Sequence, residues 1–402
     1  MDYIVKNGIS FKQDQVLRRK LISLIQICIE NLGTIVGHEI DVENIIWNVA
    51  INMKGPNYKE AAKEFVLSID SNIEEEFIFI SANNVINFED GIKELQIGPV
   101  KAIDTRELLN LVDPKAEKKW LIQVGKNIGT EIAVFPDRED ENKREYGWIT
   151  TLPAESWHVL VKASKSNVQE HALWLINTAL TILRLSYPVK HNTPLFPYIN
   201  EKEAHPFDPS IITDNNIIID KSTSNIQFGG YSLPRRYTIT NEILDHLQSI
   251  DFDKRADLIF SSNEDKLAAR IAHGIGWITR GRHTADRSER FLFFYTAIEA
   301  LLSFNPEAVT QTIARYASTL LDDDIEKRVT IAKIITEAYA IRSKLVHGGH
   351  RYVSYYDAYN AQKIAEDIYY SVLENIDLNI TTQQFESDLK KASYGLQWPP
   401  KD

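Results

Sequence analysis

The pattern of apolar and polar residues changes along the chain, and each change predicts a different kind of element. Residues 14–32 carry apolar positions at helical spacing and are followed by Gly33, which predicts an amphipathic helix. Four short runs rich in aromatic and β-branched residues come next, at residues 76–80, 120–124, 131–135 and 157–161. Such runs between turn-forming residues predict strands of an antiparallel or mixed sheet. The charged residues 137–145 are then a loop between two strands.

Helical periodicity returns at residues 167–187, and this helix is expected to stop before Pro188. Residues 188–234 contain six of the fourteen prolines of the chain. Because proline lacks the backbone donor that helices and central strands use, this stretch predicts a connection between domains. Two apolar triplets within it, 217–219 and 226–228, are candidates for edge strands of the first domain.

From about residue 240 onward the apolar positions recur at helical spacing throughout. The predicted helices cover residues 241–250, 263–279, 286–304, 308–321, 324–346 and 356–376. Long helices joined by short connections predict an antiparallel bundle. The expected fold class is therefore α+β. It comprises a mixed α/β sheet domain over residues 1–187, a proline-rich connection over 188–239 and an all-α helical bundle over 240–402.

Length and composition limit the classes of protein that fit. A chain of 402 residues is long enough for two or three domains, and 44% hydrophobic with 25% charged residues is typical of a soluble globular protein. A single cysteine, Cys28, excludes an internal disulfide and a zinc site built from several cysteines. We see no secretory signal, and Arg184 interrupts the most apolar helical stretch, 171–189. These features predict a cytoplasmic protein without a membrane partner.

The net charge of −11 argues against a generally basic nucleic-acid-binding surface, but one segment is an exception. Residues 280–290 contain four arginines, one histidine and only two acidic residues. A basic segment on an acidic protein is typical of a local phosphate-binding surface, although charged runs also occur on ordinary solvated surfaces. The candidates for phosphate contact are Arg280, Arg282, His283, Arg287 and Arg290.

Arg342 stands at a position where the predicted helix 324–346 calls for an apolar residue. The apolar positions of this helix follow steps of four and three residues, and Arg342 is in that series between Ala338 and Leu345. A charge on a packed helix face needs a partner, because burying it unpaired is costly. The preceding apolar helix offers one acidic residue after its first turn, Glu299. The pair is either part of a reactive site or an inert salt bridge between two helices.

His347 is expected at the C-terminal end of the same helix, because Gly348 and Gly349 follow it. An imidazole close to a guanidinium suits phosphodiester chemistry. Arg342 and His347 are five residues apart, however, and on a straight helix such positions diverge by about 140°. Either the last turn unwinds at Gly348, or a second copy of the domain contributes the missing group.

Three consecutive acidic residues, Asp322, Asp323 and Asp324, look at first like a metal site. They come directly before a long predicted helix. Because helix N-termini favour acidic caps, we interpret them as capping residues that stabilise the helix dipole.

The sequence Tyr-Ala-Ile-Arg-Ser-Lys-Leu-Val-His-Gly at residues 339–348 resembles the Apea-type branch of the HEPN superfamily. The signature of that superfamily is an arginine, four to six residues and a histidine. Arg290-Phe291-Leu292 and the apolar run 297–302 with Glu299 add to the resemblance, which covers about residues 240–380. It does not extend to the first half of the chain.

The resemblance implies a dimeric endoribonuclease that needs neither a metal nor another cofactor. Arg342 would bind the scissile phosphate, and His347 would act as general acid or base while the ribose 2′-hydroxyl attacks. The implied supporting residues are Glu299, Tyr339 and Ser343. RNA would be the substrate, with tRNA as one candidate, and a phage or cellular trigger would act through the N-terminal domain in antiviral defence or a toxin-like role. The RNA-binding candidates are Arg280, Arg282, His283, Arg287, Arg290, Lys344, His350 and Arg351.

One position departs from part of this family. Members that are silenced by nucleotidyl transfer carry a tyrosine two residues after the histidine, where this chain has Gly349. Control through the N-terminal domain is therefore the expectation. The alternative function is a non-catalytic module of the same fold that dimerises or holds RNA, with Arg342 and His347 retained for packing.

Overall fold

The computed structural model describes most of the helical half of the chain and several separate stretches before it. The described residues are 3–6, 9–12, 19–20, 22–26, 39–52, 58–73, 76–83, 85–107, 120–124, 132–136, 150–152, 154–163, 167–186, 217–219, 226–228, 237–261, 265–284, 286–304, 309–349, 352–396 and 398–399. The charged segment 137–145 lies outside them. Of the first predicted helix, residues 19–20 and 22–26 are described, and they are helical as expected.

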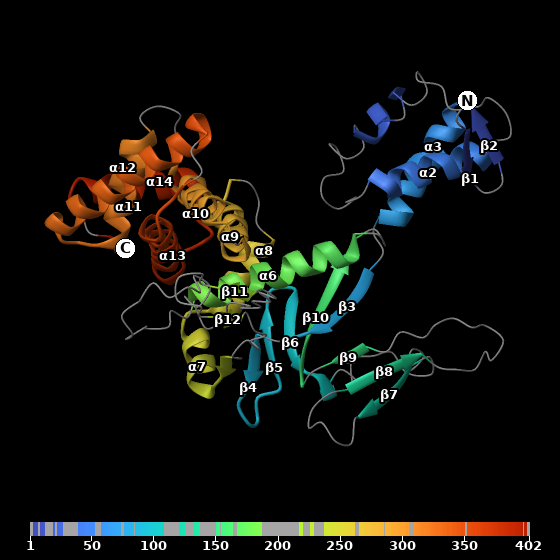
Figure 1. Cartoon of the computed structure of the whole chain (residues 1–402), viewed down its shortest axis with the longest axis horizontal. Helices are drawn as coiled ribbons and strands as arrows, with labels where there is room; N and C mark the ends of the chain where they lie inside the picture. The colour runs from blue at the N-terminus through green and yellow to red at the C-terminus, as the bar shows by residue number, and fades with distance from the viewer. Residues whose placement is uncertain are drawn as a thin grey trace. The chain divides into compact units, whose positions relative to one another are not determined.

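The chain forms two compact units, which we describe separately (Figure 1). The first contains residues 1–81 and 158–176, and the second contains residues 82–157 and 177–402. The predicted boundaries at residues 187 and 240 do not coincide with these units. The reason is that strands from the first half of the sequence pair and bond with elements of the helical half.

The first unit begins with a hairpin that the sequence pattern does not predict. Strands β1 (Tyr3–Lys6) and β2 (Ile9–Lys12) pair antiparallel, with Tyr3 opposite Lys12. Two helices follow, α2 (Glu39–Asn52) and α3 (Tyr58–Ile73), and they pack against each other. The described core of this unit includes Ile45, Trp47 and Val49 on α2.

The predicted strands exist, but they belong to two sheets and not to one. A four-stranded sheet has the order β3 (Glu76–Ala82), β10 (Glu155–Lys162), β6 (Val100–Asp104) and β5 (Glu94–Ile97). A three-stranded antiparallel sheet contains β7 (Trp120–Val124), β8 (Ile132–Pro136) and β9 (Thr150–Leu152). Alternating side chains identify a strand, but they do not identify its neighbour.

Two short strands connect the start of the helical half to the sheet region of the second unit. Strand β13 (Tyr237–Ile239) pairs in parallel with β4 (Ile86–Phe88). At the start of α7 (Asn241–Ser249), the backbone and side-chain amides of Asn241 both donate to Glu89, at 2.9 and 3.0 Å. The candidate edge strands are strands, β11 (Ile217–Ile219) and β12 (Ile226–Phe228), and they form a two-stranded antiparallel sheet with each other.

Helix α6 (Val168–Ser186) confirms the prediction of a helix that stops before Pro188. Its second half belongs to the second unit and carries Thr181, whose hydroxyl lies 2.8 Å from that of Thr279 on α9 (Leu267–His283). This contact is buried, and the two residues that make it are 98 positions apart in the sequence.

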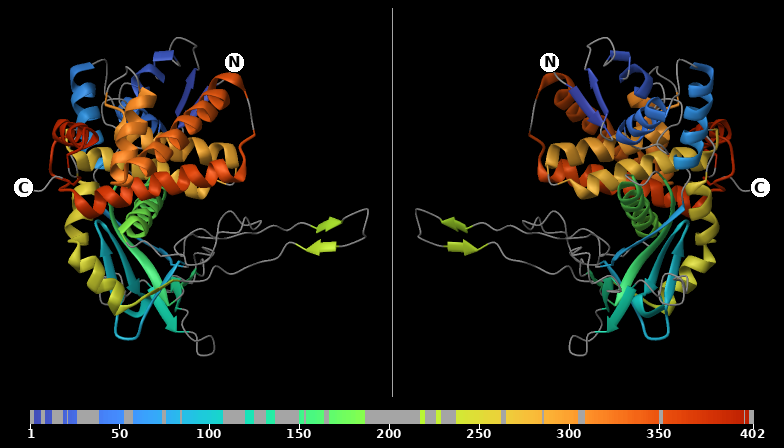
Figure 2. Two further views of the ribbon diagram at one scale, coloured as in Figure 1. Left: turned by 90° about the vertical axis from the view of Figure 1, so that its left-hand side faces the viewer. Right: turned by 90° about the vertical axis from the view of Figure 1, so that its right-hand side faces the viewer.

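The helical half forms a bundle close to the predicted one (Figure 2). After α7 its helices are α8 (Phe252–Phe260), α9, α10 (Arg287–Leu302), α11 (Val309–Leu321), α12 (Ile325–Gly348), α13 (Tyr355–Asn375) and α14 (Thr382–Ser393). The pattern does not predict the short helices α8 and α14. The α+β fold class is confirmed, and no described helix is long and apolar enough to cross a membrane.

Helix α10 is the centre of this bundle, and packs against α9, α11, α12 and α13. None of its residues from Arg290 to Leu302 is exposed. Fully buried aromatic side chains fill the space around it: Phe291, Phe294, Tyr295, Tyr316, Tyr369 and Phe385. Tyr369 on α13 donates its hydroxyl to the Ala297 carbonyl of α10 at 2.8 Å, so even the polar end of this side chain is used for packing.

Gly274 on α9 is the position where this packing is tightest. A Cβ there would lie 1.4 Å from the Tyr369 hydroxyl, whereas a Cβ at Gly276 would meet nothing within 4 Å. We expect Gly274→Ala to lower the free energy of unfolding by about 1–3 kcal/mol through overpacking. The matched Gly276→Ala should be neutral or more stable by up to about 1 kcal/mol, because alanine favours helix. Urea unfolding measures both, and equal effects would contradict the packing described here.

Candidate functional site

The predicted pairing of Arg342 with Glu299 is present between α12 and α10. The Arg342 Nη2 atom lies 3.6 Å from Glu299 Oε2, with 29% and 19% of the two side chains exposed. Arg342 is thus half-buried at its apolar-series position, and part of its side chain is open to solvent. A charge held in this way remains available to a ligand, which a fully buried pair would not be.

Two tyrosines surround the ion pair. Tyr295 precedes Glu299 by one turn of α10, and Tyr339 precedes Arg342 by about one turn of α12; their ring centroids are 6.3 Å apart. Burial raises the pKa of Glu299, and Arg342 opposes this rise. Burial also raises the pKa of Tyr295, and the neighbouring carboxylate of Glu299 raises it further. The Glu299 carboxylate is therefore poorly solvated, and its ionised form is stabilised by nearby hydrogen-bond donors and cations.

Helix α12 continues without a break through His347 to Gly348. Gly349 caps it in the left-handed conformation, with φ of 64°. The expectation that the last turn unwinds at Gly348 is therefore wrong, because the cap falls one residue later. His347 is exposed, and its side chain diverges from Arg342 by about 140° around the axis. The two groups of one copy cannot meet on one phosphate.

The helix that carries both groups is unusually open. Of the 24 residues of α12, Ile335 is the one that is fully buried. Large apolar side chains are exposed along it: Ile325 at 74%, Val329 at 62% and Val346 at 50%. At about 100° per residue Ile325 and Val329 lie within about 40° of His347 around the axis, but about 27–33 Å from it along the axis, and Val346 diverges from it by about 100°. His347 is thus exposed at one end of a helix that leaves apolar side chains exposed at both ends.

The structure divides the basic segment into buried and exposed residues. Arg282 and Arg290 are buried, which corrects their assignment as RNA-binding candidates. Arg282 Nη2 lies 2.5 Å from Glu366 Oε1, and Arg290 Nη2 donates to Gln362 Oε1 at 3.0 Å. Gln362 in turn donates to Glu366 at 3.2 Å. These arginines satisfy a polar network that ties α9 and α10 to α13, so the same charges that suggest phosphate binding serve the core.

Arg280 is exposed, and aromatic residues that sequence reasoning missed support it. Its guanidinium lies over the Trp277 ring, 4.8 Å from the centroid, and Trp277 stacks on Phe293 of α10 with 5.7 Å between centroids. His273 accepts a hydrogen bond from the Trp277 indole at 3.3 Å. The signal in the sequence is the spacing of His273, Trp277 and Arg280, which places all three on one face of a helix.

The other predicted residues are distributed around this region. His283 is exposed, with its Nδ1 bonded to the Thr279 carbonyl at 2.7 Å, and Arg287 begins α10 half-buried. Ser343 is half-buried and Lys344 exposed, both on the last turns of α12. His350 and Arg351 lie outside the described residues.

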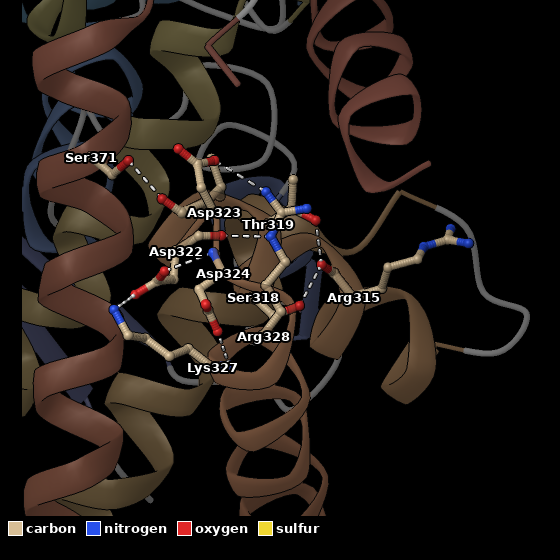
Figure 3. Close-up of polar contacts among 10 residues, drawn as sticks. Arg315, Ser318, Thr319, Asp322, Asp323, Asp324, Lys327, Arg328 and Ser371 are labelled. Carbon is tan, nitrogen blue, oxygen red and sulfur yellow. Dashed lines mark hydrogen bonds and ion pairs between the residues drawn. The ribbon is translucent and has the colours of Figure 1, made fainter. Parts of the chain in front are cut away.

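Of the three aspartates, Asp324 caps α12 as predicted, and Asp322 and Asp323 make other contacts at the same turn (Figure 3). The Asp324 side chain accepts the Lys327 amide at 3.0 Å and is the N-cap of α12. Asp322 accepts the Asp324 amide at 2.9 Å, and its other oxygen lies 3.1 Å from Lys327 Nζ. The hydrogen bonds from the Asp324 backbone amide and from Lys327 lower the pKa of Asp322. Asp323 pairs with Arg328 at 3.2 Å, so each carboxylate has a partner within the turn.

No family model, curated protein or solved structure matches the chain. The chemistry of the site is therefore argued from its own residues: a half-buried arginine held by an acid, and an exposed histidine at the capped end of the same helix.

The two classes of arginine differ in their expected contribution to stability. Arg282→Ala should lower the free energy of unfolding by about 3 kcal/mol, because it removes the cation that compensates the partly buried Glu366 charge. Arg280→Ala should cost less than about 1 kcal/mol, since it removes only an exposed cation–π contact. Thermal and urea unfolding of both variants test this, and similar losses would argue against the division.

The raised pKa of Glu299 predicts a pH-dependent contribution to stability. Between the unfolded and the folded pKa, the folded chain holds more protons at this group, so its contribution to stability falls as pH rises through that window, which begins at about pH 4. Glu299→Gln does not titrate. Its unfolding free energy, measured relative to wild type, should therefore increase from pH 4 upward. Glu337→Gln, an exposed acid of α12, is the control; a constant or shrinking difference for Glu299→Gln would contradict the assignment.

Proposed function

We propose that this chain is a HEPN-type endoribonuclease that cleaves RNA without a metal, at a composite site formed by Arg342 of one copy and His347 of another. The observation that carries the proposal is the arrangement on α12. Arg342 is held half-buried by Glu299, and the exposed His347 follows it after four intervening residues at the capped end of the helix. The spacing and the supporting acid both agree with the Arg-x4-His resemblance.

The proposed chemistry needs only these two side chains and the RNA itself. The Arg342 guanidinium binds the non-bridging oxygens of the scissile phosphate and stabilises the charge that grows there. The ribose 2′-hydroxyl loses its proton to a general base and attacks phosphorus, and the 5′-oxygen leaves with a proton from a general acid. His347 fills one of these two roles. The products are a 2′,3′-cyclic phosphate and a 5′-hydroxyl.

A second copy accounts for two features of α12 at once. It supplies the group that one straight helix cannot direct at the same phosphate, and it would cover apolar side chains that α12 leaves exposed. Val346 directly precedes His347, and Ile325 and Val329 lie at the other end of the helix. Exposed apolar side chains favour association between copies.

RNA would approach along basic surfaces formed by exposed residues, because Arg282 and Arg290 are buried. Lys344 lies next to the site on α12, and Arg280 with Trp277 offers a cation and an aromatic ring to a phosphate and a base. We place the protein in the cytoplasm, where its RNA substrate is found, with tRNA as the candidate. A role in antiviral or toxin-like defence, with release by the N-terminal half, belongs to the same proposal.

The second candidate is a module that dimerises or holds RNA without cutting it. The Glu299–Arg342 pair favours this second candidate because it also joins α10 to α12. In that case Arg342 would contribute to the stability of the fold, and His347 would have no measurable effect on RNA.

Single substitutions separate the two candidates. We expect Arg342→Ala and His347→Ala each to lower RNA cleavage at least about a hundredfold, since each removes a group that acts in the transition state. Lys333→Ala, an exposed cation earlier on the same helix, should retain most activity. Gel analysis of labelled RNA fragments, with end-group analysis for cyclic phosphate, measures this. Full cleavage by folded His347→Ala protein would reject the catalytic assignment.

Mixing the two inactive variants tests whether the site is composite. In equal mixtures of Arg342→Ala and His347→Ala chains, half of the dimers are mixed, and each mixed dimer has one intact site. Activity should return to about a quarter of the wild-type value. A site completed within one chain would give no recovery.

A further inference from the structure

Tyr295 combines complete burial with an unpartnered hydroxyl. Its side chain is 0% exposed, and among the described residues its Oη atom has no hydrogen-bond partner. Tyr369, equally buried in the same bundle, uses its hydroxyl to bond the Ala297 carbonyl. A buried donor is normally paired, because leaving it unpaired is unfavourable for folding. The exception at Tyr295 therefore needs an explanation.

The position of Tyr295 points to the ion pair of the candidate site. It precedes Glu299 by four residues on α10, so the two side chains are neighbours on one helix face. Its ring lies 6.3 Å from that of Tyr339, which precedes Arg342 by three residues on α12. Tyr295 also lines a small cavity of about 70 Å³ between α10, α12 and α13, which leaves room for its hydroxyl to move or to bind one water.

The Glu299–Arg342 pair is itself loosely closed. Its 3.6 Å separation exceeds the 2.7–2.9 Å that is usual for a charge-assisted hydrogen bond. A carboxylate can accept about four hydrogen bonds, so Glu299 has capacity for another donor. If Arg342 turned toward a phosphate, the buried Glu299 charge would lose its main stabilising partner.

We propose that Tyr295 is a positioning residue of this site: its hydroxyl donates to the Glu299 carboxylate, directly or through one water, when Arg342 engages a phosphate. Glu299 then stays ionised and keeps the guanidinium oriented. The proposal deepens the ribonuclease function and rests on it for its effect on catalysis. The donor can be tested without RNA in Arg342→Ala, where Glu299 has lost the same guanidinium.

This role predicts that stability and activity separate. Tyr295→Phe removes a hydroxyl that makes no bond in the structure, so the melting temperature should stay the same or rise. Tyr369→Phe removes a bonded hydroxyl of equal burial, so it should lower the melting temperature and leave cleavage by the folded protein unchanged. A merely structural Tyr295 would show the reverse, with activity lost only as far as stability is lost.

The kinetic test compares wild type, Tyr295→Phe, Glu299→Gln and the double variant over a range of pH. Tyr295→Phe should lower kcat about tenfold, the value of one lost hydrogen bond. It should also move the acidic limb of the profile to higher pH, because Glu299 becomes easier to protonate. In the Glu299→Gln background the same substitution should have little further effect. Independent, additive losses would overturn the proposal.

The decisive measurement is the titration of Glu299 in the Arg342→Ala background without RNA, where Glu299 has lost the guanidinium as it does when Arg342 engages a phosphate, by ¹³C NMR of the labelled carboxyl groups with Glu299→Gln as the assignment control. Adding Tyr295→Phe should raise the pKa of Glu299, and adding Tyr369→Phe should leave it unchanged. An unchanged pKa on adding Tyr295→Phe overturns the proposal even if the chain cleaves RNA. If wild type cleaves no RNA, the ribonuclease function fails, and this titration still decides whether Tyr295 supports Glu299.

Discussion

The packing of α10 against four other helices is the constraint on which the helical half depends. It contacts α9, α11, α12 and α13, and none of its residues from Arg290 to Leu302 is exposed. A charged side chain within this stretch therefore needs a partner from a neighbouring helix. Arg290 meets Gln362 of α13, and Glu299 meets Arg342 of α12. These contacts fix how α12 and α13 lie on α10. The position of the candidate site therefore follows from pairing the charged groups of one helix.

The two arginine contacts of α10 have different consequences because they differ in burial. Arg290 is 5% exposed and its network extends through Gln362 to Glu366 and Arg282, so its charge is used within the fold. The Arg342 side chain is 29% exposed and its contact with Glu299 is longer. Its charge is only partly compensated, which is the condition under which a guanidinium can bind a phosphate from solution.

Helix α12 is the counterpart of α10. It joins the bundle through one side and leaves Ile325, Val329 and Val346 exposed, the last of these next to His347. An arginine anchored to the core and a histidine on the exposed side divide one short motif between the interior and the surface. Because residues five positions apart on a helix diverge by about 140°, this division fits the site shared by two copies that we propose.

The sequence by itself determined the kind and position of most elements of the helical half, since a period of 3.6 residues is a local property. It also determined the Glu299–Arg342 pair, because one acid in an apolar helix and one arginine in an apolar series have few other partners, and it determined the capping role of Asp324. Only the tertiary structure decided the pairing of strands, including β4 with β13, because alternation carries no information about neighbours. It alone separated the buried Arg282 and Arg290 from the exposed Arg280, since charge in a sequence does not show which side of a helix will be covered. The unpaired hydroxyl of Tyr295 was likewise beyond the sequence, because an apolar position is filled equally well by a tyrosine whose hydroxyl is bonded and by one whose hydroxyl is not.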